Sequence, residues 1–228
     1  SESAKLRDAF NSKVFTAKQL EAETAKQQQA LGEARKELAA SAASVRLLSD
    51  MRSSFEGYSE SVRKLMLSAK GNADLSRRIT GIVADCMRVP AQYETAIEAC
   101  LGSALQNIIV NDEYDAKALI ARLRENRMGR VTFLPLKALK PRLLTGQERA
   151  DINEKGVCGI ASDLIACEDK VQPAIDFLLG RTVIVEDSDT AIRVMRKCGY
   201  AFRVVTLEGD VFNPGGPITG GSLRREAG

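Results

Sequence analysis

The chain has 228 residues, of which 44% are hydrophobic and 28% charged, and its formal net charge is +3. This is enough apolar sequence for one folded core or two small ones. The sequence contains no histidine, so it lacks the commonest general base at neutral pH and the commonest metal ligand, which excludes most hydrolase sites.

Membrane and disulfide signals are also missing. No run of 18 apolar residues occurs, and the first ten residues, SESAKLRDAF, lack the basic start and apolar stretch of a secretory signal. The five cysteines are scattered and form no C-x-x-C pair, so we interpret them as small buried hydrophobic residues and not as disulfide partners or zinc ligands. We expect a cytoplasmic protein that holds no metal or cofactor and binds no membrane.

Residues 1 to about 50 have the composition of a coiled-coil helix. They contain no proline and one glycine, and alternating steps of four and three from Leu6 to Leu48 pass through thirteen positions, of which nine are apolar. Such a helix needs a partner for its apolar stripe, and the sequence offers no second heptad segment. The partner would be another chain or a C-terminal continuation. A helix that folds back on its own domain is the alternative.

After Gly57 short apolar runs alternate with helical patterns, which is typical of α/β units. The sequence predicts a strand over 79–89, a helix through 96–102, a strand at 108–110, a helix over 113–126 and a strand at 131–134.

The same order then recurs further along the chain. AIDFLLG at 174–180 repeats AIEACLG at 96–102, VIVEDSDTA at 183–191 repeats IIVNDEYDA at 108–116, and RVVTL at 203–207 repeats RVTFL at 130–134. We predict a duplicated helix-strand-helix-strand unit, with residues 135–154 as the connection.

Charge is distributed unevenly over the two units. Between Lys117 and Arg149 there are nine basic and two acidic residues, whereas between Ala150 and Thr190 there are nine acidic and three basic ones. Two solvated faces would explain this switch, and so would a basic surface that meets an anion, with nucleic acid as the leading candidate.

Near the C-terminus the sequence GGPITGGS, residues 215–222, comes close to a phosphate-binding loop. Gly215, Gly220 and Ser222 match the pattern G-x-x-x-x-G-K-[ST], but Gly221 occupies the lysine position. Pro217 also removes one of the backbone N–H groups that would hold phosphate. The paired glycines better fit a tight strand connection, or an edge against which another chain packs.

The run VVTLEGDVFNPGGPITGGS at 204–222 closely resembles the end of the hinge domain of bacterial SMC (structural maintenance of chromosomes) proteins. FEGYSESVRKLM at 55–66 resembles the point where a coiled-coil arm passes into that hinge. The resemblance covers the whole chain and implies a mixed α/β (α+β) fold with two similar subdomains, preceded by a long coiled-coil helix. The implied divisions are an arm segment at 1–54, hinge subdomain I at 55–140, hinge subdomain II at 141–221 and the start of a C-terminal arm at 222–228.

The resemblance also implies that two half-hinges associate about a two-fold axis, sheet edge to sheet edge, as a ring-like homodimer. The chain would be a non-enzymatic, nucleoid-associated dimerisation module of a chromosome-organising ATPase. The nucleotide-binding heads of that ATPase would lie elsewhere, and its C-terminal arm would pair with the N-terminal one. The positions that match the family's interface glycines, with the apolar residue between them, are Gly215, Gly216, Ile218, Gly220 and Gly221.

The other expected partner is DNA, single- or double-stranded, bound through its phosphates and without sequence specificity. The candidate residues are Arg122, Arg124, Arg127, Arg130, Lys137, Lys140 and Arg142, with Arg224 and Arg225 at the arm junction.

Two other functions stay open at this point. One is an α/β nucleotide-binding protein that uses the glycine-rich tail, against which the missing lysine, the lack of histidine and the heptad arm all weigh. The other is a coiled-coil scaffold in which the globular part only caps the helix. In that case removal of residues 1–50 would abolish self-association.

Overall fold

The computed structural model describes residues 2–221, and it gives side chains from Phe10 onward. It divides into an arm unit that ends at Glu56 and a globular unit that begins at Gly57.

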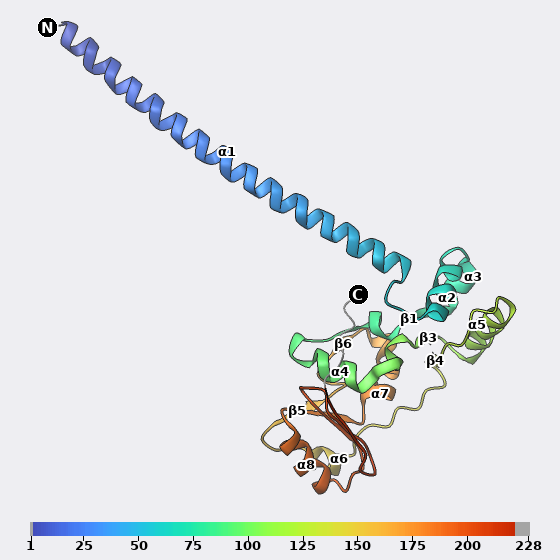
Figure 1. Ribbon diagram of the computed structural model, residues 1–228. Coiled ribbons are helices and arrows are strands. Elements are labelled where there is room, and N and C mark those ends of the chain that lie inside the picture. Colours follow the sequence, from blue (N-terminus) through green and yellow to red (C-terminus); the bar gives the residue numbers. More distant parts are fainter. Residues whose placement is uncertain (1, 222–228) are drawn as a thin grey trace. The chain divides into compact units, whose positions relative to one another are not determined.

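The arm unit is one helix, α1 (Glu2–Ser54), drawn in blue in Figure 1. Its 53 residues correspond to about 80 Å at 1.5 Å per residue. The helix ends where Phe55 and Gly57 adopt positive φ angles of 54° and 88°. The predicted long helix is confirmed, and apolar positions of its heptad stripe are exposed at Phe10, Leu20, Leu31, Leu38, Val45 and Leu48.

The globular unit alternates short strands and helices (Figure 1). Its α-helices are α2 (Glu60–Lys70), α3 (Ala73–Arg78), α4 (Glu94–Leu101), α5 (Glu113–Glu125), α6 (Gly146–Asp151), α7 (Gln172–Leu179) and α8 (Ser188–Lys197). Its strands are β1 (Ile79–Ile82), β2 (Met87–Arg88), β3 (Ile108–Val110), β4 (Phe133–Pro135), β5 (Val157–Ile160), β6 (Ala166–Cys167), β7 (Thr182–Val185), β8 (Arg203–Thr206), β9 (Val211–Phe212) and β10 (Ile218–Thr219). Its 3-10 helices are η1 (Val83–Cys86), η2 (Ala91–Tyr93), η3 (Gly102–Gln106) and η4 (Asp169–Val171).

The same strand arrangement occurs twice in this unit. In the first repeat, residues 79–135, β1 is antiparallel and β4 parallel to the central strand β3. In the second repeat, residues 157–219, β5 is antiparallel and β8 parallel to the central strand β7. Asp112 and Asp187 begin the helices α5 and α8 alike, since each carboxylate accepts backbone N–H groups of the first turn. The duplication predicted from the sequence is therefore present in the topology.

The two repeats end differently. The first sheet has the order β1-β3-β4, whereas the second continues past β8 in the order β10-β9-β8-β7-β5. A two-stranded ribbon of β2 and β6 joins the repeats. The subdomain boundaries 55–140 and 141–221 stay a prediction.

Two local predictions need correction. Residues 79–89 do not form one strand, because β1 pairs with β3 and β2 pairs with β6, and the turn η1 carries the chain from one sheet to the other. The predicted connection 135–154 contains the helix α6, which starts with a capping box: Thr145 Oγ1 accepts the N–H of Glu148, and the Glu148 carboxylate accepts the N–H of Thr145.

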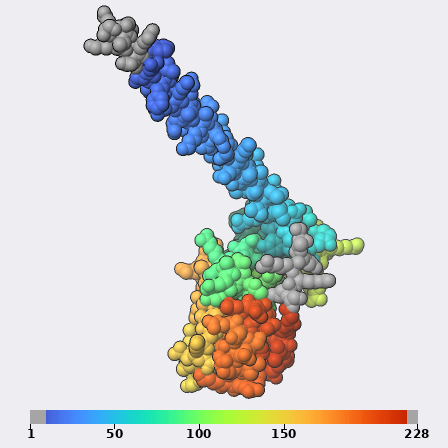
Figure 2. Space-filling model, turned by 60° about the vertical axis from the view of Figure 1, so that its left-hand side comes forward, coloured from blue at the N-terminus to red at the C-terminus, as the bar shows by residue number. Residues whose placement is uncertain are grey.

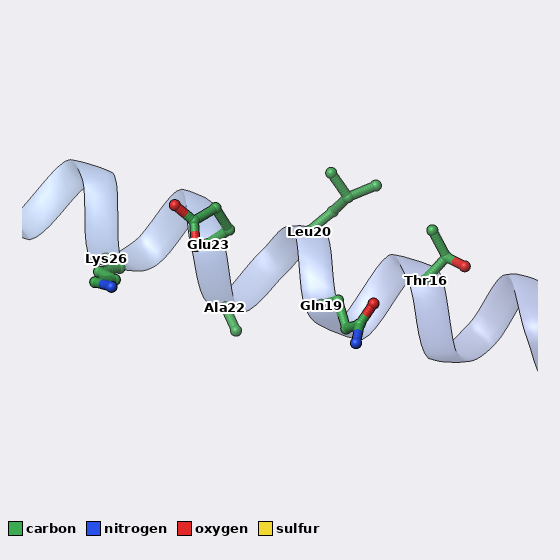
Figure 3. A pocket seen from close by; sticks show the side chains of 6 residues that line it. All are labelled: Thr16, Gln19, Leu20, Ala22, Glu23 and Lys26. Atoms are coloured by element: carbon green, nitrogen blue, oxygen red, sulfur yellow. The ribbon is translucent and has the colours of Figure 1, made fainter.

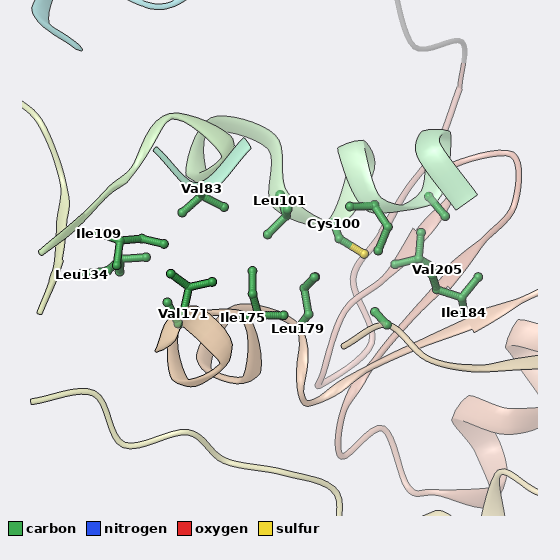
Figure 4. Packing of buried hydrophobic residues seen from close by; sticks show 14 residues of the cluster. Val83, Cys100, Leu101, Ile109, Leu134, Val171, Ile175, Leu179, Ile184 and Val205 are labelled. Atoms are coloured by element: carbon green, nitrogen blue, oxygen red, sulfur yellow. The ribbon is translucent and has the colours of Figure 1, made fainter. Parts of the chain in front are cut away.

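A hydrophobic core shared by both repeats lies between helices α4 and α7. In Figure 4, Val171, Ile175 and Leu179 project from the α7 side toward Leu101, which comes from α4. Arg203 Nη1, from β8, also donates to the carbonyl oxygen of Cys100 at the end of α4 (3.0 Å). In the space-filling view of Figure 2 the green residues of the first repeat lie directly against the orange and red residues of the second.

A second core belongs to the second repeat, apart from Leu144 and Ile152 of the preceding segment. Side chains alternate across a strand, so Val183, Val185 and Val204 face this second core while Ile184 and Val205 face the shared one. Helix α8 covers the second core through Ala191, Val194 and Met195. The central strands β7 and β8 are thus buried on both faces, whereas the edge strand β10 is exposed.

Candidate dimer edge and basic surface

Strand β10 is the outermost strand of the second sheet. Ile218 lies opposite Phe212 and Thr219 opposite Val211 in its antiparallel pairing with β9. No strand of the described residues covers its other side. Ile218 is 62% exposed, a large fraction for a residue type that is most often buried.

The hydrogen bonds of the turn before β10 show which backbone groups face the open side. Asn213 donates its N–H to the carbonyl of Pro217 (2.8 Å), so this pair is hydrogen-bonded. Hydrogen-bonded and non-hydrogen-bonded pairs alternate along an antiparallel ladder. Ile218 is therefore a non-hydrogen-bonded partner of Phe212, and its N–H and C=O point away from β9 toward the free edge.

The four glycines around this strand differ in their surroundings. Gly215, Gly216 and Gly221 have positive φ angles of 81°, 111° and 123°, and nothing lies within 4 Å of the position where a Cβ would be. Gly220 has no positive φ angle, and a Cβ there would contact Oδ1 of Asp210. Gly215, Gly216 and Gly221 thus allow a backbone conformation that favours glycine and leave open space beside them. At Gly220 it is Asp210 of the same chain that leaves no room for a side chain.

Within the described residues this segment is a turn followed by an edge strand. A phosphate loop instead leads from a strand into a helix. Ser222, the last residue of the apparent motif, lies outside the described residues.

The predicted DNA-binding residues fall into two groups at opposite ends of α5. Arg122 and Arg124 lie in its last turn, with Arg127 and Arg130 in the loop that follows. Lys137, Lys140 and Arg142 come after β4, at the end of the repeat where α5 begins. The 13 residues of α5 correspond to about 20 Å. Arg224 and Arg225 lie outside the described residues.

Among the described residues, the first group, from Arg122 to Arg130, has more basic side chains without an acidic partner than the second. Within the part of the chain that the structure describes, no acidic side chain pairs with Arg124, Arg127 or Arg130, and all three are exposed. Arg122 is half-buried and donates to Ser68 Oγ of α2 (3.4 Å).

The second group is partly neutralised. Lys137 Nζ pairs with Asp112 Oδ2 (3.0 Å), and this hydrogen bond is the main reason why the pKa of Asp112 is lowered.

The sequence reasoning missed basic residues on α2. Because Arg122 contacts Ser68, the last turn of α2, which ends at Lys70, lies beside the last turn of α5. Lys70 is exposed in this last turn, whereas Lys64, earlier in the helix, pairs with Glu60. The wide separation of Lys70 from Arg122 in the sequence hid this proximity.

Residues 76–195 match the family model described as the SMC proteins Flexible Hinge Domain, which is more than half of the chain. The chain belongs to this family. Its mixed fold, in which a long helix is followed in the sequence by two similar units, matches a solved SMC hinge, as the resemblance implied.

The SMC hinge of Geobacillus stearothermophilus, solved as an asymmetric dimer, is 38% identical, with a TM-score of 0.81 over 87% of this chain and 80% of that one. The Pyrococcus furiosus SMC hinge is 31% identical, with a TM-score of 0.56 over 73% of this chain and 90% of that one.

Among curated relatives, the chromosome partition protein Smc of Desulfitobacterium hafniense is 40% identical over 87% of this chain, and that of Halothermothrix orenii is 42% identical over 77%. The chain spans only 16% and 14% of the length of these two proteins.

The cysteines of this SMC hinge are packing residues. Cys100 is buried and the other four are half-buried. Burial raises the pKa of the Cys100 thiol to about 12. The described residues contain no group of three or more potential metal ligands, and no helix among them is long and apolar enough to cross a membrane.

An ionic interaction fixes the segment between the repeats. Arg181 Nη2 and Nη1 donate to the two carboxylate oxygens of Glu148 (2.6 and 3.1 Å), and Nη1 also donates to the carbonyl of Leu143 (3.2 Å). The Arg181 guanidinium and the N–H of Thr145 together hold the pKa of Glu148 at about 2.

On the arm helix, a shallow surface hollow is lined by Thr16, Gln19, Leu20, Ala22, Glu23 and Lys26 (Figure 3). All six residues come from α1, so the hollow is a furrow in the surface of one helix. Leu20 belongs to the apolar stripe, which identifies this side of α1 as a place where a second helix can pack.

Proposed function

We propose that the chain is the dimerisation module that joins the coiled-coil arms of a chromosome-organising SMC ATPase. The observation that carries the proposal is the edge strand β10, which is flanked by glycines and which no further strand of the described residues covers. The first repeat supplies a partner for it. Its strand β4 is equivalent to β8, and β8 is covered by β9 whereas β4 has no neighbour on that side among the described residues.

In the dimer that we propose, β10 of each copy pairs with β4 of the other. Two identical interfaces then close a ring with two-fold symmetry, in which β4 and β10 of each copy are both paired. Gly215, Gly216 and Gly221 leave space for the approaching chain, and Ile218 would be buried on association.

The test is the molar mass of the chain by light scattering, with two matched variants. Ile218→Lys places a charge on the edge strand and should yield monomers at micromolar concentration. The pair Leu31→Glu and Leu38→Glu breaks only the arm stripe and should leave the dimer intact. Loss of the dimer with the stripe variant but not with Ile218→Lys would instead support the coiled-coil scaffold.

We also propose that Arg124, Arg127 and Arg130, with Arg122 beside them, contact DNA phosphates. The support is their shared location at one end of α5 and their lack of acidic partners in the described chain. Lys70 of α2 extends the same surface.

The salt dependence of DNA binding would distinguish this surface from the second basic group, Lys137, Lys140 and Arg142. Replacing Arg124, Arg127 and Arg130 by alanine should reduce the slope of log K against log salt by about 0.9 for each phosphate that is no longer neutralised. The matched triple replacement of Lys137, Lys140 and Arg142 should change it less, because Lys137 is already paired. Equal effects of the two triples would show that net charge alone drives binding.

The remaining parts of the proposal concern the full-length protein. The ATPase heads would lie outside this chain, the C-terminal arm would cover the stripe of α1, and the whole protein would associate with the nucleoid.

A further inference from the structure

Asp210 lies opposite Gly220 in the hairpin of β9 and β10. The pairing of Ile218 with Phe212 and of Thr219 with Val211 places Gly220 and Asp210 next in register. By the alternation set at Asn213 this is a non-hydrogen-bonded pair, in which Cα atoms approach to about 4.5 Å and side chains lie closest. The carboxylate of Asp210 occupies the place that a side chain at 220 would need.

Hydrogen bonds within the second repeat hold Asp210 in that place. Ser188 Oγ, at the first residue of α8, donates to Asp210 Oδ2 (3.0 Å). The N–H of Asp210 donates to Thr206 Oγ1 (3.0 Å), and its carbonyl accepts the N–H of Thr206 (3.0 Å). Thr206 is buried, and the N-terminus of α8 favours a negative charge beside it. The carboxylate is thus tied to the rigid part of the sheet.

This arrangement opposes a shift of β10 along β9. A one-residue slip in one direction would bring Thr219 opposite Asp210, and its branched side chain would meet the carboxylate. A slip in either direction would break the bond from Asn213 to Pro217. Either slip would exchange the residues whose backbone groups point to the free edge.

We propose that Asp210 is a positioning residue that sets the register of the edge strand β10, and that Gly220 lacks a side chain because of Asp210 and not because of a partner chain. The proposal rests on the proposed dimer, since register matters only if the edge is used. Ile218 then presents its N–H and C=O to the second copy in one fixed arrangement.

The experiment compares Asp210→Ala, Gly220→Ala and the double variant in the full chain, with Glu208→Ala as a matched loss of charge in the same turn. Sedimentation gives the dimer Kd. Hydrogen exchange at Thr219, recorded where all proteins are monomeric, reports the hairpin alone.

We expect Asp210→Ala and Gly220→Ala each to raise the dimer Kd about fivefold to tenfold, because each loosens the register by about the free energy of one ordinary hydrogen bond. Exchange at Thr219 should accelerate while exchange at Val205 stays slow. In the double variant the effect of Gly220→Ala should shrink, because the clashing carboxylate is gone. Asp210→Asn keeps an acceptor for Ser188 and should restore most of the wild-type affinity. It is also the readout if Asp210→Ala fails to fold.

Wild-type Kd and wild-type exchange at Thr219 in both single variants would overturn the proposal, and so would strictly additive effects in the double variant. A wild-type chain that never dimerises would defeat the proposed function. In that case exchange at Thr219 would still decide whether Asp210 sets the register.

Discussion

The two repeats share an order of strands and helices, yet they differ in how their sheets end. The first stops at β4, whereas the second adds β9 and β10 beyond the equivalent strand β8. Among residues 2–221, the first repeat therefore leaves β4 uncovered, and the second has additional strands at the equivalent edge. A duplicated fold with this mismatch can be complementary to a second copy of itself, which two identical repeats with covered edges could not be.

The largest expected effect is a loss of stability that involves both repeats. Leu179 is fully buried in the core shared by α4 and α7, so Leu179→Ala should lower the free energy of unfolding by about 2–5 kcal/mol. Met195→Ala, in the second core, should cost a similar amount but leave the packing of α4 against α7 intact. Urea denaturation followed by hydrogen exchange checks this. Faster exchange at Ile109 in Met195→Ala than in Leu179→Ala would contradict it.

A smaller loss of stability is expected in the segment that leads into the second repeat, at the ion pair of Glu148 and Arg181. Glu148→Gln should cost about 1.5–3 kcal/mol at pH 7, because the Arg181 guanidinium loses its charged partner. The pKa of Glu148 is lowered from 4.5 to about 2, so this stabilisation is present above pH 4.5 and is lost as the pH falls toward 2.

Unfolding midpoints in urea at pH 7 and pH 2 measure this pH dependence. The wild-type chain and Glu148→Gln should differ at pH 7 and converge at pH 2. Glu186→Gln, at an exposed position, serves as the control. A constant difference across this range would show that the carboxylate charge is not responsible.

The smallest effect concerns chemistry and not stability. Cys100 should be the slowest of the five cysteines to react with a thiol reagent at pH 8, because a pKa of about 12 leaves almost no thiolate. Mass spectrometry of the labelled peptides would show this. Rapid labelling of Cys100 in the folded chain would mean that α4 separates readily from β8.

The sequence predicted the repeat well because each buried strand is a short apolar run and each helix has its own period. It failed at 79–89, where an apolar run continues through η1 although the chain changes sheets. The capping box of α6 was visible as Thr145 and Glu148, but the surrounding proline and glycine suggested a loop.

The candidate site was less predictable. The glycines of the tail were identified from the sequence, but only the three-dimensional structure shows that Gly220 faces Asp210 whereas Gly215, Gly216 and Gly221 face open space. The basic residues were predicted as one group because they are close in sequence. Helix α5 divides them, since its two ends lie on opposite sides of the repeat.

The common core between α4 and α7 has a mechanical consequence. Both repeats bury side chains in this core, and Arg203 of the second repeat donates to the end of α4 in the first, so we expect the two repeats to move as one body. A force applied to one repeat would therefore be transmitted to the other. Under mechanical load we expect the contacts of the short edge strand β10 to break first, because neither Ile218 nor Thr219 belongs to either core.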